Sequence, residues 1–553
     1  MGQDKRVILA FALSFGMLIL WRVFYVKEPP PAPKASAPAP SRPAQGQPAV
    51  PVKPRAPVPL PVLAGKKAAE IVVESGLCRV TFSTQGAVVK SWVLKKYRDG
   101  KDQPLDVVNG PACEQLGYPM SFNLADQELA RNLNTVLYVT TPSTASLTAP
   151  AKLEFTFSDG KIQAKKQFSF GPGYETRVEM SVFDGQRYLP VEAVWPGGFG
   201  DHSLPVATES AMSQAFYGTL EKVTKVAQRK VEEDRTIPGP LDLAGMEDRY
   251  FVDTFLPGSP EQAFRFARRE WNPVDWKEKD KPKPLLAVLG SAQPKPLAFR
   301  LFVAPKDLDV LHSAEPPLDS LVDFGWFSVV AKPLFLGLRY IHDHWIHNYG
   351  WAIVILTLLI NLAMFPLKLK SIRSAQEMQR IAPLVKSIQE KYKHLKFNDP
   401  RKQRMNQEVM KLYQEHHINP LGSCLPMVFQ LPFLYGFYRV LDLSIELRHA
   451  PWLLWLKDLS APDPIYILPT LMVVTMFILQ KMTPVATADP AQQRMMMIMP
   501  LMFGIMFFRF ASGLVLYWLT SNVVGIAQQA FINRITPASQ PLPGPRKAAP
   551  VKD

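Results

Sequence analysis

Cysteine is scarce in this chain, which has only three cysteines in 553 residues, Cys78, Cys113 and Cys424. So few thiols exclude a disulfide-rich scaffold and a cysteine-rich metal centre. Cys78 and Cys113 fall in one segment, and their spacing leaves a disulfide between them open, because spacing carries no information on geometry. The chain also lacks a glycine-rich loop followed by Lys and Ser or Thr, so nothing predicts ATP hydrolysis.

Other signatures of catalysis and of nucleic-acid binding are missing as well. His342, His344 and His347 lie close together in sequence, but no cluster of cysteines or carboxylates accompanies them, which does not favour a metal site. The formal charge of +15 comes without a nucleic-acid-binding motif. We therefore expect no enzyme activity, no cofactor and no specific nucleic-acid site.

Acidic residues are absent from the segment 29–61, which instead contains 13 prolines. This composition cannot build a core and predicts an extended tether over 28–67. Before the tether, Lys5 and Arg6 precede an apolar run that is typical of a signal sequence or of a signal anchor. No small-residue cleavage site follows the run closely, which favours an uncleaved anchor over 1–27.

The segment 68–322 alternates apolar and polar residues with a period of two. Leu153, Phe155 and Phe157 run into Asp159-Gly160, and the alternation resumes afterwards, which indicates a β-hairpin. The segment therefore predicts a large antiparallel β-sandwich. The next segment, 323–345, spaces its apolar residues as one face of a helix and predicts an amphipathic helix lying in the membrane interface or, alternatively, packed on the sandwich.

Long apolar runs dominate the segment 346–534. The predicted spans are 349–369, 418–439, 464–481, 494–509 and 511–533, the fourth being short and bracketed by Arg494 and Arg509. Six methionines crowd this short span, a pattern typical of ordinary core filling or of a surface that adapts to many partners. With the N-terminal anchor, the fold class is a polytopic α-helical membrane protein of six spans, five forming the core, with a large extracytoplasmic β-sandwich.

Basic residues indicate the orientation of the chain. Residues 368–417 carry 12 Lys or Arg against 5 Asp or Glu, whereas residues 439–463 carry 3 against 4. The positive-inside rule therefore makes the first loop cytoplasmic, with both termini inside and the β domain outside. Two apolar stripes within the loop predict a cytoplasmic helical hairpin over 374–417, and a basic cytoplasmic tail follows over 535–553.

Polar side chains inside the apolar runs are the most informative feature. An amide without a partner costs several kcal/mol in hydrocarbon, so such residues should face one another or water. They could line a hydrated interior or simply join helices by hydrogen bonds. Arg373 follows the first run closely and is, from periodicity alone, an interfacial anchor or a functional charge. The polar residues singled out are Gln430, Thr475, Gln480, Tyr517, Trp518, Thr520, Ser521, Asn522, Gln528 and Gln529.

Several strings resemble one family closely. INPLGSCLPMVFQLPFLYGFY, ELRHAPWLLWLKDLSAPDPIYILPTLMVVTMFILQKMTP and FASGLVLYWLTSNVVGIAQQAFINR are similar to the YidC membrane protein insertases, relatives of the mitochondrial Oxa and chloroplast Alb proteins, over about residues 323–534. The resemblance implies five core helices around a hydrophilic groove, with Arg373 in the place of the family's groove arginine and Arg380 as a second choice. It also implies substrate contact at Tyr517 and Trp518, and a β-supersandwich similar to galactose-mutarotase folds.

The function that this resemblance implies is membrane protein insertion in the bacterial inner membrane, alone or beside the Sec translocon. The expected partners are nascent membrane proteins, the ribosome, the Sec translocon and the lipid bilayer. Two alternatives stay open: a polytopic transporter or channel with a periplasmic binding domain, which should show repeated halves, and a membrane-anchored carbohydrate enzyme, which needs paired carboxylates. The sequence shows neither repeated halves nor an evident pair of carboxylates.

Overall fold

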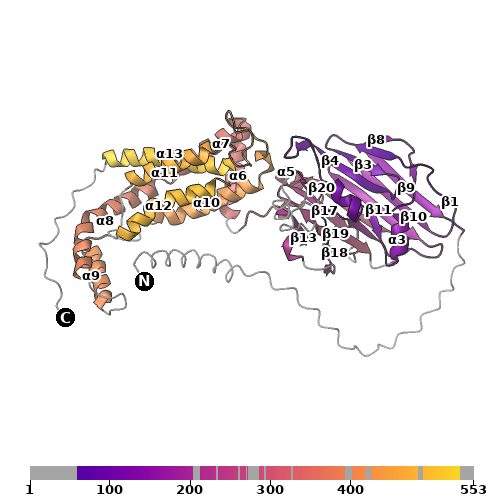
Figure 1. Ribbon diagram of the computed structural model, residues 1–553, viewed down its shortest axis with the longest axis horizontal. Coiled ribbons are helices and arrows are strands. Elements are labelled where there is room, and N and C mark those ends of the chain that lie inside the picture. The colour runs from indigo at the N-terminus through magenta and orange to yellow at the C-terminus, as the bar shows by residue number, and fades with distance from the viewer. Residues whose placement is uncertain are drawn as a thin grey trace, which may run out of the picture. The chain divides into compact units, whose positions relative to one another are not determined.

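The chain forms two compact units in the computed structural model, each described here by itself (Figure 1). One unit comprises Pro51–Asp323 with Leu443–Ile445, and the other comprises the remaining residues. The structure describes residues 59–203, 212–231, 235–259, 262–269, 271, 285–291, 294–325, 328–392, 401–418, 425–483 and 490–535. The predicted anchor over 1–27, most of the tether over 28–67 and nearly all of the tail over 535–553 lie outside the described residues.

The β unit is built on one large antiparallel sheet. Its strands, in spatial order, are β1 (Val62–Leu63), β9 (Ala151–Asp159), β10 (Gln163–Phe170), β11 (Glu175–Phe183), β20 (Leu297–Pro305), β17 (Phe251–Pro257), β16 (Leu243–Glu247), β13 (Gln214–Gly218) and β14 (Val223–Ala227), and β7 (Val139–Thr141) also pairs with β9. The predicted hairpin is present, because β9 and β10 pair antiparallel around the turn at Asp159-Gly160. Asp159 Oδ1 accepts hydrogen bonds from the backbone N–H groups of Lys161 and Ile162, each at 2.8 Å, and Gly160 has a φ of 91°, a region that favours glycine.

Two five-stranded sheets complete the β unit. One contains β15 (Arg235–Ile237), β18 (Gln262–Arg268), β19 (Leu285–Ser291), β12 (Glu192–Trp195) and β6 (Ser121–Asn123), and the other contains β5 (Pro104–Asp106), β4 (Val88–Arg98), β3 (Cys78–Ser83), β2 (Glu70–Glu74) and β8 (Ser146–Thr148). The described sheets are antiparallel, as predicted, except that β2 and β8 pair in parallel. Parallel neighbours need a long connection, and the chain supplies one between these two strands.

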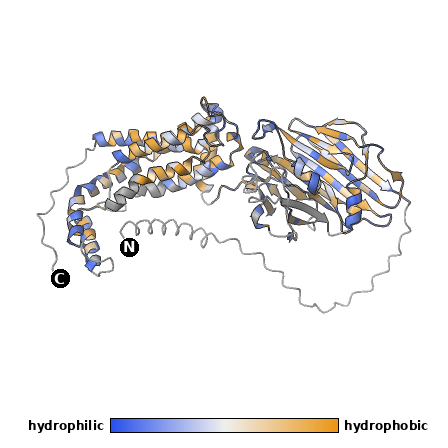
Figure 2. Cartoon of the chain, in the orientation of Figure 1, coloured by the Kyte–Doolittle hydropathy of each residue, from blue (hydrophilic) through white to orange (hydrophobic). Residues whose placement is uncertain are grey.

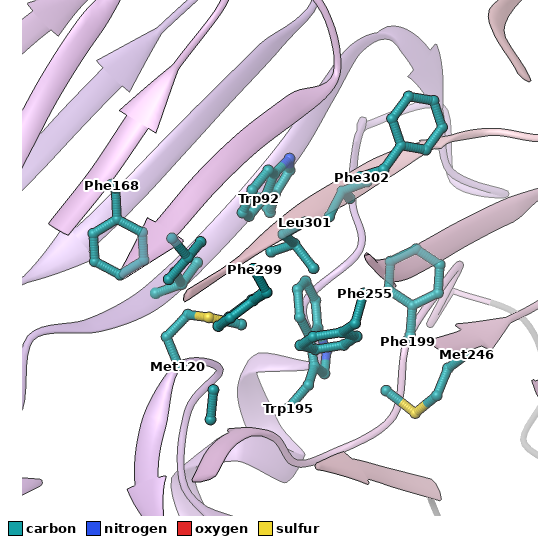
Figure 3. Close-up of a cluster of buried hydrophobic side chains, with 14 of the residues drawn as sticks. Trp92, Met120, Phe168, Trp195, Phe199, Met246, Phe255, Phe299, Leu301 and Phe302 are labelled. Carbon is teal, nitrogen blue, oxygen red and sulfur yellow. The ribbon is translucent and has the colours of Figure 1, made fainter. Parts of the chain in front are cut away.

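Aromatic side chains from all three sheets meet in one core (Figure 3). Phe82 and Phe168 place their ring centroids 4.7 Å apart, and Trp92 lies 6.2 Å from Trp195. Burial of this apolar surface, at about 25 cal/mol per Å², is the main force holding the sheets together. Cys78 and Cys113 are both buried in the unit as free thiols, so the disulfide that the sequence left open is not formed.

Short helices lie between and after the strands of the β unit. Helices α2 (Gly110–Leu116) and α3 (Gln127–Leu133) and the 3₁₀ turn η1 (Gln228–Lys230) connect strands, whereas α5 (Leu308–His312) and the 3₁₀ turn η2 (Asp319–Leu321) follow the last strand. A further 3₁₀ turn, η3 (Ile445–Leu447), belongs to a much later part of the chain. Each α-helix is preceded by a capping residue, Asn109, Asp126 or Asp307, whose side-chain oxygen accepts a backbone N–H of the first turn. These side chains satisfy donors that a helix start would otherwise leave open.

The second unit is helical over the residues that the structure describes. Its helices are α6 (Ser328–His344), α7 (Tyr349–Ala363), α8 (Phe365–Lys391), α9 (Arg401–Glu415), α10 (Leu425–Leu443), α11 (Ile467–Met482), α12 (Pro490–Phe507) and α13 (Ser512–Ile535). Helix α13 packs against α7 and α11, and α11 also packs against α12. Hydrophobic colour dominates α7 and α11, whereas α9 is largely hydrophilic (Figure 2).

The first predicted span is bent. Helix α7 ends at Ala363, and α8 begins at Phe365 at an angle of 57°, so the apolar run over 349–369 is not one straight helix. Pro366, in the first turn of α8, explains the break, since proline cannot donate the hydrogen bond that a continuous helix requires. In the described part of the chain no single helix is both long and apolar enough to cross a membrane, and the bent pair α7–α8 meets that criterion only by its combined length and composition.

Helices α8 and α9 form an antiparallel pair with its own small core. Ile381 and Val385 of α8 pack with Ile418, and partly buried side chains of α9 complete the cluster. Tyr392 Oη donates a hydrogen bond of 2.7 Å to Glu408 Oε1. The residues 393–400 between the two helices lie outside the described part.

Candidate functional site

Asn361 is the centre of a polar cluster inside the helical unit. It lies on the last turn of α7 and is only 5% exposed. Its Nδ2 donates to Thr357 O at 2.8 Å, and its own backbone oxygen accepts from Gln528 Nε2 of α13 at 3.0 Å. Ser521 Oγ of α13 donates to Asn361 Oδ1 at 3.4 Å. These contacts join α7 to α13 by hydrogen bonds.

Lys368 reaches into the same cluster from the first turn of α8. Its Nζ donates to Asn361 Oδ1 at 2.6 Å and to Gln528 Oε1 at 3.3 Å. The bend at Met364 makes this possible, because it redirects the chain between Asn361 and Lys368. We call Asn361, Lys368, Ser521 and Gln528 the polar cluster.

The polar cluster carries a basic group without an acidic partner. Both acceptors of Lys368 are neutral amide oxygens, and within the described residues no carboxylate forms an ion pair with Lys368. A basic group held among helices by neutral acceptors is costly to keep there and is functional by default in a membrane protein. Its chemistry suits an incoming carboxylate or polar backbone rather than a cation.

A second polar contact lies on another face of α13. Asn522 Nδ2 donates to Thr475 Oγ1 at 3.2 Å and to Met472 O at 3.3 Å, both on α11. Asn522 is 6% exposed. Asn522 therefore joins α13 to α11 by hydrogen bonds, which is the second of the two roles considered for such residues from the sequence. It does not contact the polar cluster.

The aromatic pair of α13 is divided between two neighbours. Tyr517 is 3% exposed and stacks on Phe437 of α10, with ring centroids 4.4 Å apart and an interplanar angle of 16°. Trp518 is half-buried and packs edge-on against Phe507 of α12 at 4.9 Å. Tyr517 is thus packed as a core residue, whereas Trp518 retains accessible surface.

Four further predicted site residues are not brought to the polar cluster. Arg373 and Arg380 are exposed on α8, and Gln430 of α10 and Gln480 of α11 are half-buried. Neither Asn361 nor Lys368 was predicted as a site residue from the sequence. A signal was available, since Asn361 is the one side-chain amide in the apolar run 349–367 and Lys368 follows it by seven residues.

Three helices carry apolar side chains on exposed faces. These are Leu358, Leu359 and Leu362 of α7, Leu471, Val474 and Ile478 of α11, and Ile498, Leu501 and Ile505 of α12, each at least 42% exposed. Met502 and Met506 lie on the same short helix α12 and are 52% and 44% exposed. Such faces are suited to lipid or to another apolar helix.

The β unit offers a cleft of about 370 Å³, whose lining includes Asp99, Asp106, Asp201, His202 and Trp271. Its carboxylates are engaged by the fold itself. Asp106 Oδ1 accepts from the N–H groups of Trp92 and Val108, and Asp201 Oδ1 accepts from Ser203 Oγ at 2.6 Å. The described residues hold no group of three or more metal-ligating side chains.

Comparison with known proteins covers nearly the whole chain. The family model described as 60Kd inner membrane protein matches residues 340–539, and that described as YidC periplasmic domain matches residues 70–336. A membrane protein insertase YidC of Syntrophus aciditrophicus is 34% identical over 560 residues, covering 96% of this chain and 100% of its own. One of Geotalea daltonii is 35% identical over 558 residues, covering 97% and 100%.

Solved structures show weaker similarity. The active YidC insertase structure with its first transmembrane domain resolved shares 17% identity, with a TM-score of 0.35 over 85% of this chain and 94% of that one. A GalM/aldose epimerase homologue from C. elegans shares 8% identity, with a TM-score of 0.29 over 43% and 98%. The two family models and the full-length identity decide the assignment: the chain belongs to the YidC family of membrane protein insertases.

Proposed function

We propose that this insertase receives a polar or acidic segment of a newly made membrane protein at its polar cluster while the apolar segment leaves along an exposed helix face. The observation that carries the proposal is Lys368, a half-buried basic group held between α7, α8 and α13 by neutral oxygens alone. A carboxylate of the substrate would supply the missing counter-charge. The attraction is stronger in this shielded setting than in bulk water.

Hydrophobic transfer of the substrate provides the driving force. Moving a 20-residue apolar segment from water into lipid gains about 25 cal/mol for each Å² of apolar surface buried. The exposed faces of α7, α11 and α12 offer a surface along which that segment can leave for the bilayer. No nucleotide chemistry is needed in this mechanism.

The remaining parts have roles that follow from their charge and place in the chain. With the anchor over 1–27, the predicted spans make six crossings, both termini lie in the cytoplasm and the β domain lies in the periplasm. The α8–α9 pair carries exposed basic residues, including Arg373 and Arg380, which attract anionic surfaces such as ribosomal RNA and lipid head groups. A substrate handed over by the Sec translocon would meet the same polar cluster.

The test is insertion of a single-span protein with an acidic tail into liposomes that contain the purified chain. We expect insertion by the wild type and by a variant lacking residues 70–320, because the polar cluster lies outside that segment. The variants Arg373→Ala and Arg373→Lys test whether the exposed arginine takes part in insertion. Equal insertion by both arginine variants and the wild type assigns Arg373 to the interface. Solute flux through the liposomes without insertion would support the transporter alternative instead.

A further inference from the structure

The loop between α10 and α11 carries two exposed leucines at its tip. Leu453 is 40% exposed and Leu454 is 88% exposed. Leu454 also has a φ of 46°, a backbone region that residues other than glycine seldom adopt. An apolar side chain held in an unfavourable backbone conformation at the most exposed point of a loop calls for an explanation outside the loop itself.

The loop is a built structure beneath this tip. Trp452 N donates to Leu456 O, and Leu456 N donates to Leu453 O, both at 2.9 Å. Leu456 and Leu459, at the base of the loop, are each 1% exposed and pack inside the protein. The turn therefore holds Leu453 and Leu454 outward while the neighbouring leucines face inward.

The loop is seated on the ends of two helices. Asn348, the cap of α7, donates through Nδ2 to Pro451 O at 3.0 Å. A Cβ on Gly350 of α7 would collide with the ring of Trp452. At the start of α13, Gly513 N donates to Leu459 O at 2.9 Å. The tip therefore belongs to the end of the helical unit at which α7 and α13 begin.

Two amphipathic aromatic residues are exposed at this same end. Trp351 of α7 is 39% exposed and packs edge-on against Trp452 at 5.6 Å, and Tyr466 is 51% exposed. Tryptophan and tyrosine gather where a membrane protein passes from hydrocarbon to head groups. Leu453, Leu454, Trp351 and Tyr466 are thus all exposed at this end of the helical unit.

We propose that Leu453 and Leu454 insert into the lipid surface at the end of the helical unit where α7 begins. The two leucines act as a wedge in the acyl boundary, held at fixed height by Leu456, Leu459 and the α7 cap. This wedge anchors the loop and perturbs lipid packing beside the helices. The two leucines lie at the opposite end of α7 from the polar cluster. The lipid-insertion proposal can therefore be refuted without affecting the proposed insertase mechanism, and the mechanism can be refuted without affecting the lipid-insertion proposal.

The experiment places a fluorophore at the tip of the full chain in lipid nanodiscs. Leu454→Cys is labelled with bimane, and Lys457→Cys, exposed three residues further on, is the matched control. Both changes are made with Cys424→Ser, whereas Cys78 and Cys113 are buried in the folded chain and are left in place. Each sample is titrated with iodide in water and with lipids that carry a nitroxide high on the acyl chain.

We expect the nitroxide lipids to quench the probe at 454 at least about three-fold more strongly than the probe at 457, with the opposite order for iodide, because only an apolar side chain enters the acyl boundary. Leu454→Asp, judged by the quenching of a bimane on Leu453→Cys, should move the tip toward water. Equal iodide quenching at 454 and 457 overturns the proposal. A second result would also overturn the proposal: the probe at 454 becomes protected from both quenchers only when a second protein is added. The tip would then bind protein and not lipid.

Discussion

Replacing Lys368 by Met removes the basic group of the polar cluster and keeps most of its length. The wild-type Nζ makes hydrogen bonds of 2.6 Å to Asn361 Oδ1 and 3.3 Å to Gln528 Oε1. Asn361 Oδ1 would still accept from Ser521 Oγ, whereas Gln528 Oε1 would lose its contact with Lys368. A fully buried acceptor left unmet costs about 1–3 kcal/mol, and Gln528 is only half-buried, so the helical unit should weaken by no more than this and remain folded.

The functional effect should depend on the substrate. Two unit charges 4 Å apart attract by about 1 kcal/mol in bulk water and about 4 kcal/mol at an effective dielectric constant of 20. Since each 1.4 kcal/mol corresponds to about a factor of ten, Lys368→Met should slow insertion of an acidic-tailed substrate about ten-fold or more. Insertion of the same substrate with its tail acids changed to amides should fall less than about two-fold, because that tail offers no counter-charge.

The assay is protease protection of the substrate tail in proteoliposomes, with initial rates for both tails. Lys368→Arg should retain most of the acidic-tail rate, and Lys370→Met, which removes an exposed lysine two residues away, should leave both rates unchanged. If Lys368→Met slows the two tails by the same factor, Lys368 only stabilises the helices. If it slows neither, the polar cluster takes no part in insertion.

Three further predictions concern the β unit. Lys166 is fully buried and donates to Gly86 O, Ala87 O and Met120 O, so Lys166→Met should lower the thermal stability of this unit by about 3 kcal/mol or more, and an unchanged melting temperature would contradict this. Burial raises the pKa of Asp253 far above its ordinary range, so the folded state keeps a proton that the unfolded chain loses, and the stability of the fold should fall as the pH rises above about 4. Asp253→Asn should abolish this pH dependence and be more stable than the wild type at pH 8. Parallel curves of stability against pH for the two proteins would refute this prediction. Burial also raises the pKa of the Cys113 thiol to about 12, so maleimide at pH 8 should label Cys78 and Cys113 only after unfolding, as mass spectrometry of the two states will show.

Several features of the chain follow from the sequence because they depend on local chemistry. Period-two alternation around Asp159-Gly160 predicts the β9–β10 hairpin, since neighbouring residues decide both the strand faces and the turn. Charge-free runs predict apolar helices for the same reason. The family assignment also rests on sequence, because strings such as FASGLVLYWLTSNVVGIAQQAFINR are specific without any coordinates.

Tertiary structure decided the composition of the candidate site. Lys368 lies 160 residues before Gln528, and no periodicity within either helix predicts that they touch. The bend beside Pro366 brings Lys368 back onto Asn361, whereas Arg373, one and a half turns further along α8, is exposed. Sequence spacing determines which face of one helix a residue occupies. Which neighbour covers that face depends on long-range packing, and that packing separates Ser521 and Gln528, which face α7, from Asn522, which faces α11.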